Sequence, residues 1–448
     1  MTRRKYWSAV ESMSPEELRD LQADKLRKQL CAVHRRSPFY RRKFAAVGAL
    51  PEDIRTPEEL AGLPFTDKQE LRQSQRARPP LGEHAGADMA EVVRVHATSG
   101  TTGTPSFVGV TAHDSALWSE AVARAYYAQG IRTESVVVIG FSIGFFVGGI
   151  PVQQALAAIG ATAVPVGTGA TDRLIDAAID LGADSLTCTP SFARHIAESL
   201  TTRRGIDPSE LRLRRVLVGA EPGGGIPAVR AALEESWNAT VTESVGNGDV
   251  IPIHSGECEE QVGNHFLVPD MVLAEVIDPS TGEVLHVGRR PVRGELVLTH
   301  LDRECGALVR FRTRDHVEAW SGGCACGRTG WRMVCVGRTD DMLLVRGVNV
   351  WPSAVKDIVS GFAPRVTGHL RIALDGEGHH LEPPLNVVVE VPDRSAIHPA
   401  EIEEELRARL VASCSVSFVD AGTFPRTHTK EKLLWRRDLD PDPCRAEA

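Results

Sequence analysis

The chain has 448 residues, of which 51 are basic and 59 acidic, and its formal net charge is −8. This length exceeds what one hydrophobic core normally holds, so we expect two or more domains. The acidic balance argues against a nucleic-acid binder or a membrane-surface protein, and no apolar run is long enough to span a bilayer. We expect a cytoplasmic protein, because no apolar segment follows the basic first residues.

The first 80 residues are predicted to be largely helical. Ser14-Pro15-Glu16-Glu17 combines a capping serine, a proline for the first turn and a glutamate three residues after the cap, which is typical of a helix start. Thr56-Pro57-Glu58-Glu59 repeats this chemistry, and a further helix is expected to begin within residues 66–70. We interpret this region as a packing segment or lid.

Strands and helices alternate from about residue 90 to residue 335. Apolar strands are predicted at 135–140, 184–188 and 215–220, and helices at 172–181, 191–200 and 226–237. Such strands between helices are typical of sheets covered on both faces, so the fold class is α/β. Ligands of these sheets bind beyond the carboxyl ends of the strands. Four segments at such ends predict one site, namely Ser99–Thr104, Gly140-Phe141-Ser142, Thr189-Pro190 and Gly219-Ala220-Glu221.

The pattern changes toward the C-terminus. Residues 274–298 are predicted to be rich in strands, with a hairpin turn at 278–282. Strands near 368–374, 385–391 and 415–420 and a helix near 399–411 indicate a small α+β domain. We therefore predict a large N-terminal domain of residues 1–339, with helix-covered sheets and a β-rich subdomain, and a small C-terminal domain of residues 340–448.

The loop Ser99-Gly100-Thr101-Thr102-Gly103-Thr104 follows a short strand at 92–95. Its glycines allow a tight turn in which several N–H groups converge, and its hydroxyls add donors, as in a phosphate cradle. No Gly-Lys-Ser/Thr closes the loop, so it is not a Walker motif. On these residues alone a flexible surface loop is an equally good interpretation.

The loop resembles the phosphate-binding loop of the adenylate-forming enzymes, the superfamily of acyl- and aryl-CoA synthetases and luciferases. Its flanks, Arg94-Val95-His96 and Val108-Gly109-Val110-Thr111, resemble the phenylacetate–coenzyme A ligase branch. The resemblance covers nearly the whole chain and is also strong from Gly337 to Ser353. It implies a mobile C-terminal domain that rotates about Asp340 as a hinge.

The resemblance also implies roles for individual residues. Lys430 falls at the catalytic lysine, with Lys432 as the fallback, and Asp249 falls at the carboxylate that helps to hold Mg2+. The implied ATP-binding residues are Ser99, Gly100, Thr101, Thr102, Gly103, Thr104, Gly219, Ala220, Glu221, Asp315 and Arg338. The acyl-pocket candidates Phe141, Phe145, Gly148, Gly149 and Gly246 suggest a flat aromatic acid.

Four residues depart from the pattern of this branch. Thr104 replaces a lysine, Arg314 replaces a glycine, and Val245 replaces a tyrosine. Asp249 replaces a glutamate, although a shorter carboxylate can still bind magnesium through water.

Three thiols and one imidazole form a separate set. Nine cysteines in so long a chain do not indicate a disulfide framework. Cys258, His265, Cys324 and Cys326 together supply a complete tetrahedral zinc site with no open position, and some relatives of the ligase branch carry the same pattern. Such a closed set predicts structural Zn2+. The alternative is a group of reduced cysteines in a core.

The resemblance implies that a small-molecule carboxylic acid reacts with ATP and Mg2+ to give an acyl-adenylate and pyrophosphate. Coenzyme A is the expected acyl acceptor. The alternative is a CoA-independent ligase that passes the acyl group to an amine, a hydroxyl or a carrier-protein thiol. A non-catalytic nucleotide- or acyl-binding protein is a further hypothesis, and Asp315, Asp340 and Lys430 argue against it. Nucleic-acid and membrane partners are not expected, and a homodimer is one possible assembly.

Overall fold

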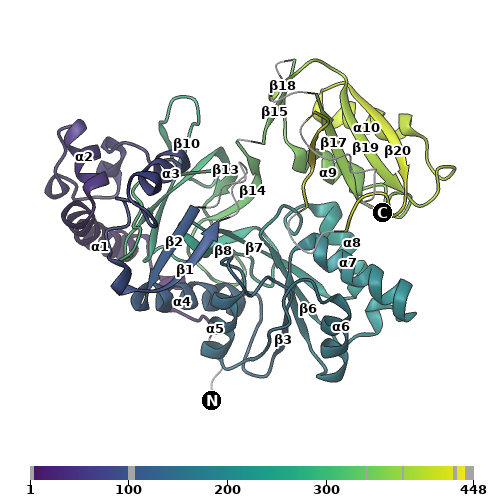
Figure 1. Cartoon of the computed structure of the whole chain (residues 1–448), viewed down its shortest axis with the longest axis horizontal. Coiled ribbons are helices and arrows are strands. Elements are labelled where there is room, and N and C mark those ends of the chain that lie inside the picture. Colours follow the sequence, from purple (N-terminus) through teal and green to yellow (C-terminus); the bar gives the residue numbers. More distant parts are fainter. Residues whose placement is uncertain are drawn as a thin grey trace. The chain divides into compact units, whose positions relative to one another are not determined.

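The computed structural model describes residues 5–98, 106–339, 341–346, 348–375, 378–426 and 431–438 (Figure 1). Ser99–Thr104, Asp340 and Lys430 lie outside these residues, so their predicted roles stay predictions. The chain forms two compact units, each built from two stretches: Met1–Thr187 with Thr242–Val334, and Cys188–Val241 with Cys335–Ala448. None of the described helices has both the length and the apolar character that crossing a membrane requires.

The predicted N-terminal helices form in the first unit, as α1 (Pro15–Arg36), α2 (Pro38–Ala46) and α3 (Lys68–Ala77). Ser14 caps α1 as predicted. The Glu17 amide donates to the Ser14 hydroxyl at 3.2 Å, and the Ser14 amide donates to the Glu17 carboxylate at 3.0 Å. The second predicted start gives only a short turn, η3 (Glu58–Gly62), because Gly62 and Pro64 disfavour a longer helix.

Helices α1 and α2 pack through one apolar face. Leu26, Leu30 and Val33 recur at helical spacing and are buried, and Tyr40 and Phe44 of α2 join the same cluster. The remaining members come from distant parts of the first unit, Leu273, Leu301, Ala307 and Val309 among them. Three further 3₁₀ turns connect the elements of this region: η1 (Ala9–Ser12), η2 (Pro51–Asp53) and η4 (Met89–Glu91).

The α/β prediction is confirmed by a group of parallel strands. β3 (Val136–Ile139) pairs with β4 (Thr162–Val164) and with β5 (Ser185–Cys188), in both cases in parallel. Val137, Val138 and Ile139 are fully buried, as expected for a strand covered on both faces. The helices of this stretch are α4 (Ala112–Ala128), α5 (Ile150–Ile159) and α6 (Thr171–Asp180).

The rest of the first unit is largely antiparallel. β1 (Val92–Thr98) and β2 (Ser106–Thr111) form a separate two-stranded sheet whose last pair is Thr98 with Ser106. The larger antiparallel group has the order β11-β10-β12-β13-β14-β9-β8-β7. Its strands are β7 (Thr240–Asn247), β8 (Ile251–Gly256), β9 (Asn264–Phe266), β10 (Val272–Ile277), β11 (Val284–Leu285), β12 (Val292–His300), β13 (Phe311–Trp320) and β14 (Arg332–Arg338). The predicted hairpin at 278–282 connects β10 to β11.

The second unit contains an α/β segment and the predicted α+β region. Its first stretch holds α7 (Pro190–Ser199), η5 (Leu200–Arg204), η6 (Pro208–Glu210), β6 (Arg215–Gly219) and α8 (Pro227–Trp237). The later strands are β15 (Leu343–Val345), β16 (Val348–Val350), β17 (Leu370–Leu374), β18 (His380–Leu381), β19 (Leu385–Val391), β20 (Cys414–Asp420) and β21 (Leu434–Arg436). The helices among them are α9 (Pro352–Ser360) and α10 (Pro399–Leu410).

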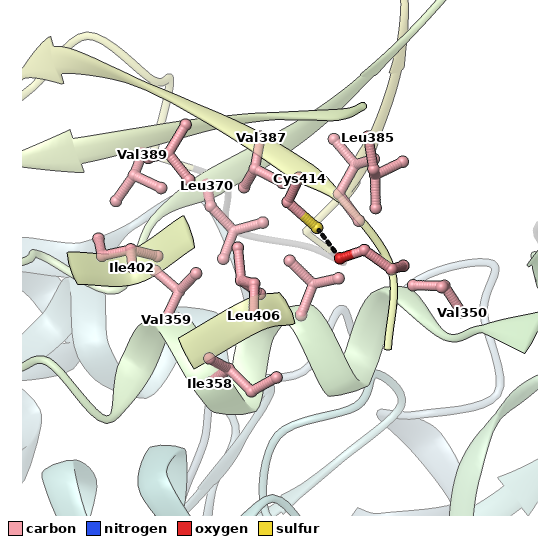
Figure 2. Packing of buried hydrophobic residues seen from close by; sticks show 14 of the residues in the cluster. Val350, Ile358, Val359, Leu370, Leu385, Val387, Val389, Ile402, Leu406 and Cys414 are labelled. Carbon is pink, nitrogen blue, oxygen red and sulfur yellow. Dashed lines mark hydrogen bonds between the residues drawn. The ribbon is translucent and has the colours of Figure 1, made fainter. Parts of the chain in front are cut away.

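A four-stranded sheet of order β20-β19-β17-β21 organises the C-terminal region. β19 runs antiparallel to β17, whereas β20 is parallel to β19 and β21 is parallel to β17. Helices α9 and α10 pack against this sheet through buried aliphatic side chains (Figure 2). These include Ile358, Val359, Leu370, Val387, Val389, Ile402 and Leu406. This core fixes the strands that carry the charged groups described below.

Candidate active site and metal site

The four predicted zinc ligands meet in the first unit. Cys258 lies two residues after β8, His265 lies on β9, and Cys324 and Cys326 lie between β13 and β14. Their ligand atoms all lie within 4.8 Å of one another. The sulfurs of Cys258 and Cys324 are 3.7 Å apart, and the Cys326 sulfur is 3.5 Å from His265 Nε2. Three sulfurs and one nitrogen at this spacing fit a tetrahedral zinc site.

Backbone geometry and electrostatics support the same set. Gly327 has φ +82° and its amide donates to the Cys324 carbonyl at 2.8 Å, which turns the chain beneath the thiols. The hydrogen bond between Cys258 and Cys326 raises the pKa of the Cys258 thiol and lowers that of the Cys326 thiol. The Cys326 sulfur therefore favours the thiolate form that binds metal.

The Cys324–Cys326 turn is attached to the N-terminal segment. The Tyr6 hydroxyl donates to the Cys326 carbonyl at 3.3 Å. The Arg328 guanidinium donates to the Glu11 carboxylate at 2.7 Å, and both side chains are almost fully buried. A metal in this site would therefore stabilise residues that are more than 300 positions apart in the sequence.

A lysine stands at the base of the predicted phosphate loop. Lys68 lies at the start of α3, and its ammonium donates to the Thr98 hydroxyl at 2.6 Å. The same ammonium pairs with the carboxylate of Asp249, the predicted Mg2+ ligand. Thr98 and Ser106 flank the loop and their hydroxyls are 2.9 Å apart. The structure thus brings a cation, a carboxylate and two hydroxyls together where β1 ends and β2 begins.

Sequence reasoning missed Lys68 as a site residue and assigned it only to a helix start. One signal could have found it, because no lysine occurs between Lys68 and Lys356 in a chain that otherwise favours arginine. Its partners were not visible from local pattern, since Thr98 and Asp249 are 30 and 181 positions away.

The acyl-pocket candidates lie close to this constellation. The Ala97 amide donates to the Phe145 carbonyl at 2.9 Å, which ties β1 to the segment before α5. A Cβ at Gly149 would lie 2.4 Å from the Ser142 carbonyl oxygen, so only glycine fits there. A Cβ at Gly248 would lie 3.1 Å from Thr98 Cγ2 and 3.5 Å from Val147 Cγ2. The segment before α5, the end of β1 at Thr98 and the turn that carries Asp249 therefore lie next to one another.

The surroundings of Gly246, Val245 and the phenylalanines differ. A Cβ at Gly246 would lie 1.7 Å from the Pro252 carbonyl oxygen, so the close approach of β7 and β8 requires this glycine. Val245, in the place of a tyrosine, packs against the apolar core of the first unit. Phe145 and Phe146 are 49% and 44% exposed, which leaves aromatic surface beside the hairpin, whereas Phe141 packs against Gly148.

The Asp315 segment keeps an unusual backbone. Asp315 lies on β13, is 9% exposed, and its amide donates to the Thr313 hydroxyl at 3.0 Å. Arg314 has φ +66°, a conformation that favours glycine. The pattern of the branch has a glycine at this position. Arg314 adopts the backbone conformation that suits that glycine, so its backbone is strained.

In the second unit, the segment Gly219–Glu221 ends β6 as predicted. Ala220 has φ +71°, and Glu221 is 9% exposed. One Glu221 oxygen accepts the Ser191 amide at 2.7 Å, at the start of α7. The other oxygen accepts the Glu431 amide at 2.5 Å. Arg338, at the end of β14, is half-buried.

Two family patterns match the chain. The pattern described as AMP-binding enzyme matches residues 23–300, and the pattern of the AMP-binding enzyme C-terminal domain matches residues 347–437. The first of these alone covers more than half of the sequence.

Known proteins with similar sequences and structures agree with these matches. A phenylacetate–coenzyme A ligase of Thermus thermophilus is 38% identical over 390 residues, which are 86% of this chain and 85% of that protein. A 2-hydroxyisobutyryl-CoA ligase in the postadenylation state, in complex with R3-HIB-AMP, is 25% identical with a TM-score of 0.90, covering 98% of this chain and 94% of that one. The same ligase with 2-HIB-AMP and CoA, in the thioesterification state, is 26% identical with a TM-score of 0.72, covering 97% and 93%.

Proposed function

From the premise that this chain belongs to the AMP-binding enzyme family, in its phenylacetate–coenzyme A ligase branch, we propose that it activates a carboxylic acid with ATP and transfers the acyl group to coenzyme A. In the first half-reaction a carboxylate oxygen bonds to the α-phosphorus of ATP and pyrophosphate leaves. In the second, the thiol of coenzyme A bonds to the acyl carbon and AMP leaves. Within the structure, the constellation of Lys68, Thr98 and Asp249 is the observation that carries this proposal.

The first half-reaction brings two anions together, so it requires fixed positive charge. Lys68 supplies such a charge at the foot of the loop Ser99–Thr104, where a β- or γ-phosphate would lie. This lysine compensates for Thr104, which stands where the branch has a lysine. Lys430 is proposed to bridge the carboxylate and the α-phosphate.

The donor set beside Lys68 also fits magnesium. The Asp249 carboxylate and the Thr98 hydroxyl are hard oxygen donors that reach the same ammonium. Asp249 would hold the ion together with phosphate oxygens. When bound, Mg2+ screens the charge of the triphosphate.

We propose an aromatic acid as the substrate class. Phe141 and Phe145 supply flat apolar surface, and Gly148 and Gly149 keep the adjoining segment free of side chains. Both phenylalanines precede the turn that leads into α5, and the Phe145 carbonyl accepts the Ala97 amide of β1.

The ligand geometry of Cys258, His265, Cys324 and Cys326 supports a structural Zn2+. With four protein ligands the ion has no position for substrate, so it takes no part in the reaction. A cytoplasmic location and a homodimer stay predictions, to be measured by cell fractionation and by light scattering.

A pyrophosphate-release screen tests the function. The purified chain is incubated with ATP, Mg2+ and one acid at a time, including phenylacetate, benzoate and 2-hydroxyisobutyrate, with and without coenzyme A. We expect the highest release with an aromatic acid, and an acyl-CoA product by mass spectrometry. Accumulation of adenylate in the presence of coenzyme A, with its consumption only by an amine or a carrier protein, would instead establish the alternative acceptor. Absence of pyrophosphate release with every acid would contradict the proposal.

A further inference from the structure

The residue that follows Lys430, Glu431, is buried beside a lysine, a histidine and an arginine in the second unit. The Glu431 carboxylate lies 2.7 Å from Lys356 Nζ, 3.3 Å from His369 Nδ1 and 3.3 Å from Arg371 Nη1. Lys356 belongs to α9, His369 immediately precedes β17, and Arg371 lies on β17. The side chains of Glu431 and Lys356 are each only 3% exposed.

Such burial is costly for a charge unless partners compensate it. Burial alone would raise the pKa of Glu431, but Lys356 and His369 hold that pKa well below its usual range. Glu431 is therefore a carboxylate at neutral pH. A solvated tail would not need a buried carboxylate with three basic partners. The cluster therefore indicates that Glu431 is held in a defined position.

The chain on both sides of Lys430 is fixed by this and similar contacts. After Glu431, the Ile372 amide donates to the Leu433 carbonyl at 2.8 Å, and β21 continues the sheet. Before Lys430, the Arg426 guanidinium pairs with the buried Glu390 carboxylate at 2.7 Å and with Glu198 of α7 at 3.1 Å. Arg426 and Glu431, the described residues nearest to Lys430 on either side, are thus each held by ion pairs.

The main chain of Glu431 is also bound to a candidate nucleotide-binding residue. Its amide donates to Glu221, whose other oxygen holds the first turn of α7. His369 lies between Glu431 and Glu198, with Nε2 3.5 Å from the Glu198 carboxylate. Contacts from α9, β17 and the Gly219–Glu221 segment therefore converge on Glu431, the residue that follows Lys430.

We propose that Glu431 is a positioning residue for Lys430 in the adenylation half-reaction. The buried carboxylate fixes the path of the chain, so that the neighbouring lysine is held in reach of the α-phosphate. This inference rests on the proposed function. A displacement of about 1 Å in a reacting group can reduce a rate by roughly a hundredfold. Loss of the buried Glu431 carboxylate should therefore slow adenylation strongly.

The test separates the two half-reactions in the full-length protein. Adenylation is measured as pyrophosphate release with ATP and the acid selected by the screen, and thioester formation is measured with the synthetic adenylate of that acid and coenzyme A. Glu431→Gln removes the charge, and Lys356→Met with Glu431→Gln removes both buried charges and keeps the volume. The matched control is Glu382→Gln, an acid of the same region that is 84% exposed and pairs with Arg346. Lys430→Ala reports on the lysine itself.

For both Glu431 variants we expect adenylation kcat to fall about tenfold to a hundredfold, with little change in KM for ATP. Thioester formation and the control should stay within about threefold of wild type. The double variant should unfold closer to the wild-type temperature than Glu431→Gln alone, because it does not leave the buried Lys356 ammonium without its carboxylate. Wild-type adenylation in the double variant would overturn the inference, as would an equal loss of both half-reactions.

The Lys430→Ala variant distinguishes the two proposals. If it is inactive while both Glu431 variants adenylate normally, only the positioning role is wrong. If it adenylates at the wild-type rate, or if wild type releases no pyrophosphate, the proposed function of Lys430 fails and the inference fails with it.

Discussion

The Lys68 ammonium donates to the Thr98 hydroxyl at 2.6 Å, which bonds the first turn of α3 to the last residue of β1. Lys68→Met should therefore weaken the grip on the triphosphate. We expect kcat/KM for ATP in pyrophosphate release to fall about tenfold to a hundredfold, as when one fixed donor is removed from a site of developing charge.

Two further variants complete this experiment. Lys68→Arg keeps the charge and should retain more activity than Lys68→Met. Lys28→Met removes a lysine that is 75% exposed and serves as the control. Unchanged ATP kinetics in folded Lys68→Met protein would show that this lysine only neutralises Asp249.

Zinc should be present at one ion per chain by elemental analysis, because four ligand atoms converge within 4.8 Å. Cys324→Ser should lose the ion and lower the unfolding temperature, since metal-binding energy at such a site is folding energy. It should also speed tryptic cleavage near the N-terminus, because Tyr6 and Glu11 are held by the Cys326–Arg328 segment. Cys31→Ser, at an exposed cysteine, is the control. Wild-type protein that is metal-free and equally stable would refute the zinc site.

Arg314 offers a test of backbone strain. Because its φ is +66°, Arg314→Val should destabilise the protein by about 1–2 kcal/mol, whereas Arg314→Gly should stay within about 1 kcal/mol of wild type. Urea denaturation measures both. Glu318→Val on the same strand, where φ is not positive, should change stability by no more than about 0.5 kcal/mol. Equal effects of valine at the two positions would argue against strain.

Three buried histidines predict a loss of stability in acid. Burial lowers the pKa of His84 and of His300 to about 4, and that of His254 to about 3. A histidine in the unfolded chain titrates near pH 6.5, so unfolding takes up protons below that pH. The stabilisation from these neutral rings is therefore complete above about pH 6.5 and is lost as the pH falls toward 4.

His300→Gln isolates one of these groups. The His300 ring donates to the Val250 carbonyl at 3.0 Å and accepts the Leu308 amide at 2.9 Å, which fixes its neutral form. Glutamine offers a donor and an acceptor but does not titrate. Between pH 6.5 and 4 the slope of unfolding free energy against pH should decrease by up to about 1.4 kcal/mol per unit. The difference between the two proteins should be constant above pH 7.5, and a constant difference at all pH values would contradict the prediction.

The hinge prediction is tested by Asp340→Pro. Proline fixes φ and removes an amide donor, so it should hinder the backbone rotation implied for this position. We expect single-turnover pyrophosphate release to stay near the wild-type value while acyl transfer to coenzyme A is blocked. Normal transfer in this variant would refute a hinge at Asp340.

Local chemistry made much of the fold predictable. The Ser14 cap, the buried strand at Val136–Ile139 and the hairpin at 278–282 each depend on residues that are close in sequence. The grouping of Cys258, His265, Cys324 and Cys326 was predictable as well, because few residue types bind zinc. At Thr56–Glu59 the capping pattern predicted a helix start but no length, and the structure has only the short turn η3 there.

Lys68 and Glu431 were not predictable in the same way. Lys356, which pairs with the buried Glu431 carboxylate, is 75 positions away from it in the sequence. Asp249 is 181 positions from Lys68. Each side chain taken alone is an ordinary surface charge in a helix start or a basic tail. Only the tertiary structure buries it and supplies the opposite charge.

The discontinuity of the two units restricts how the chain can fold on the ribosome. Glu11 leaves the exit tunnel early, yet its buried partner Arg328 follows 317 positions later. Translation proceeds at about 5–20 residues per second, so the N-terminal segment waits for tens of seconds before that contact can form. During this interval Leu26, Leu30 and Phe44 also lack Leu273 and Val309, which complete their cluster. A nascent chain stalled near residue 241 would therefore expose apolar surface and be a target for chaperones or proteases.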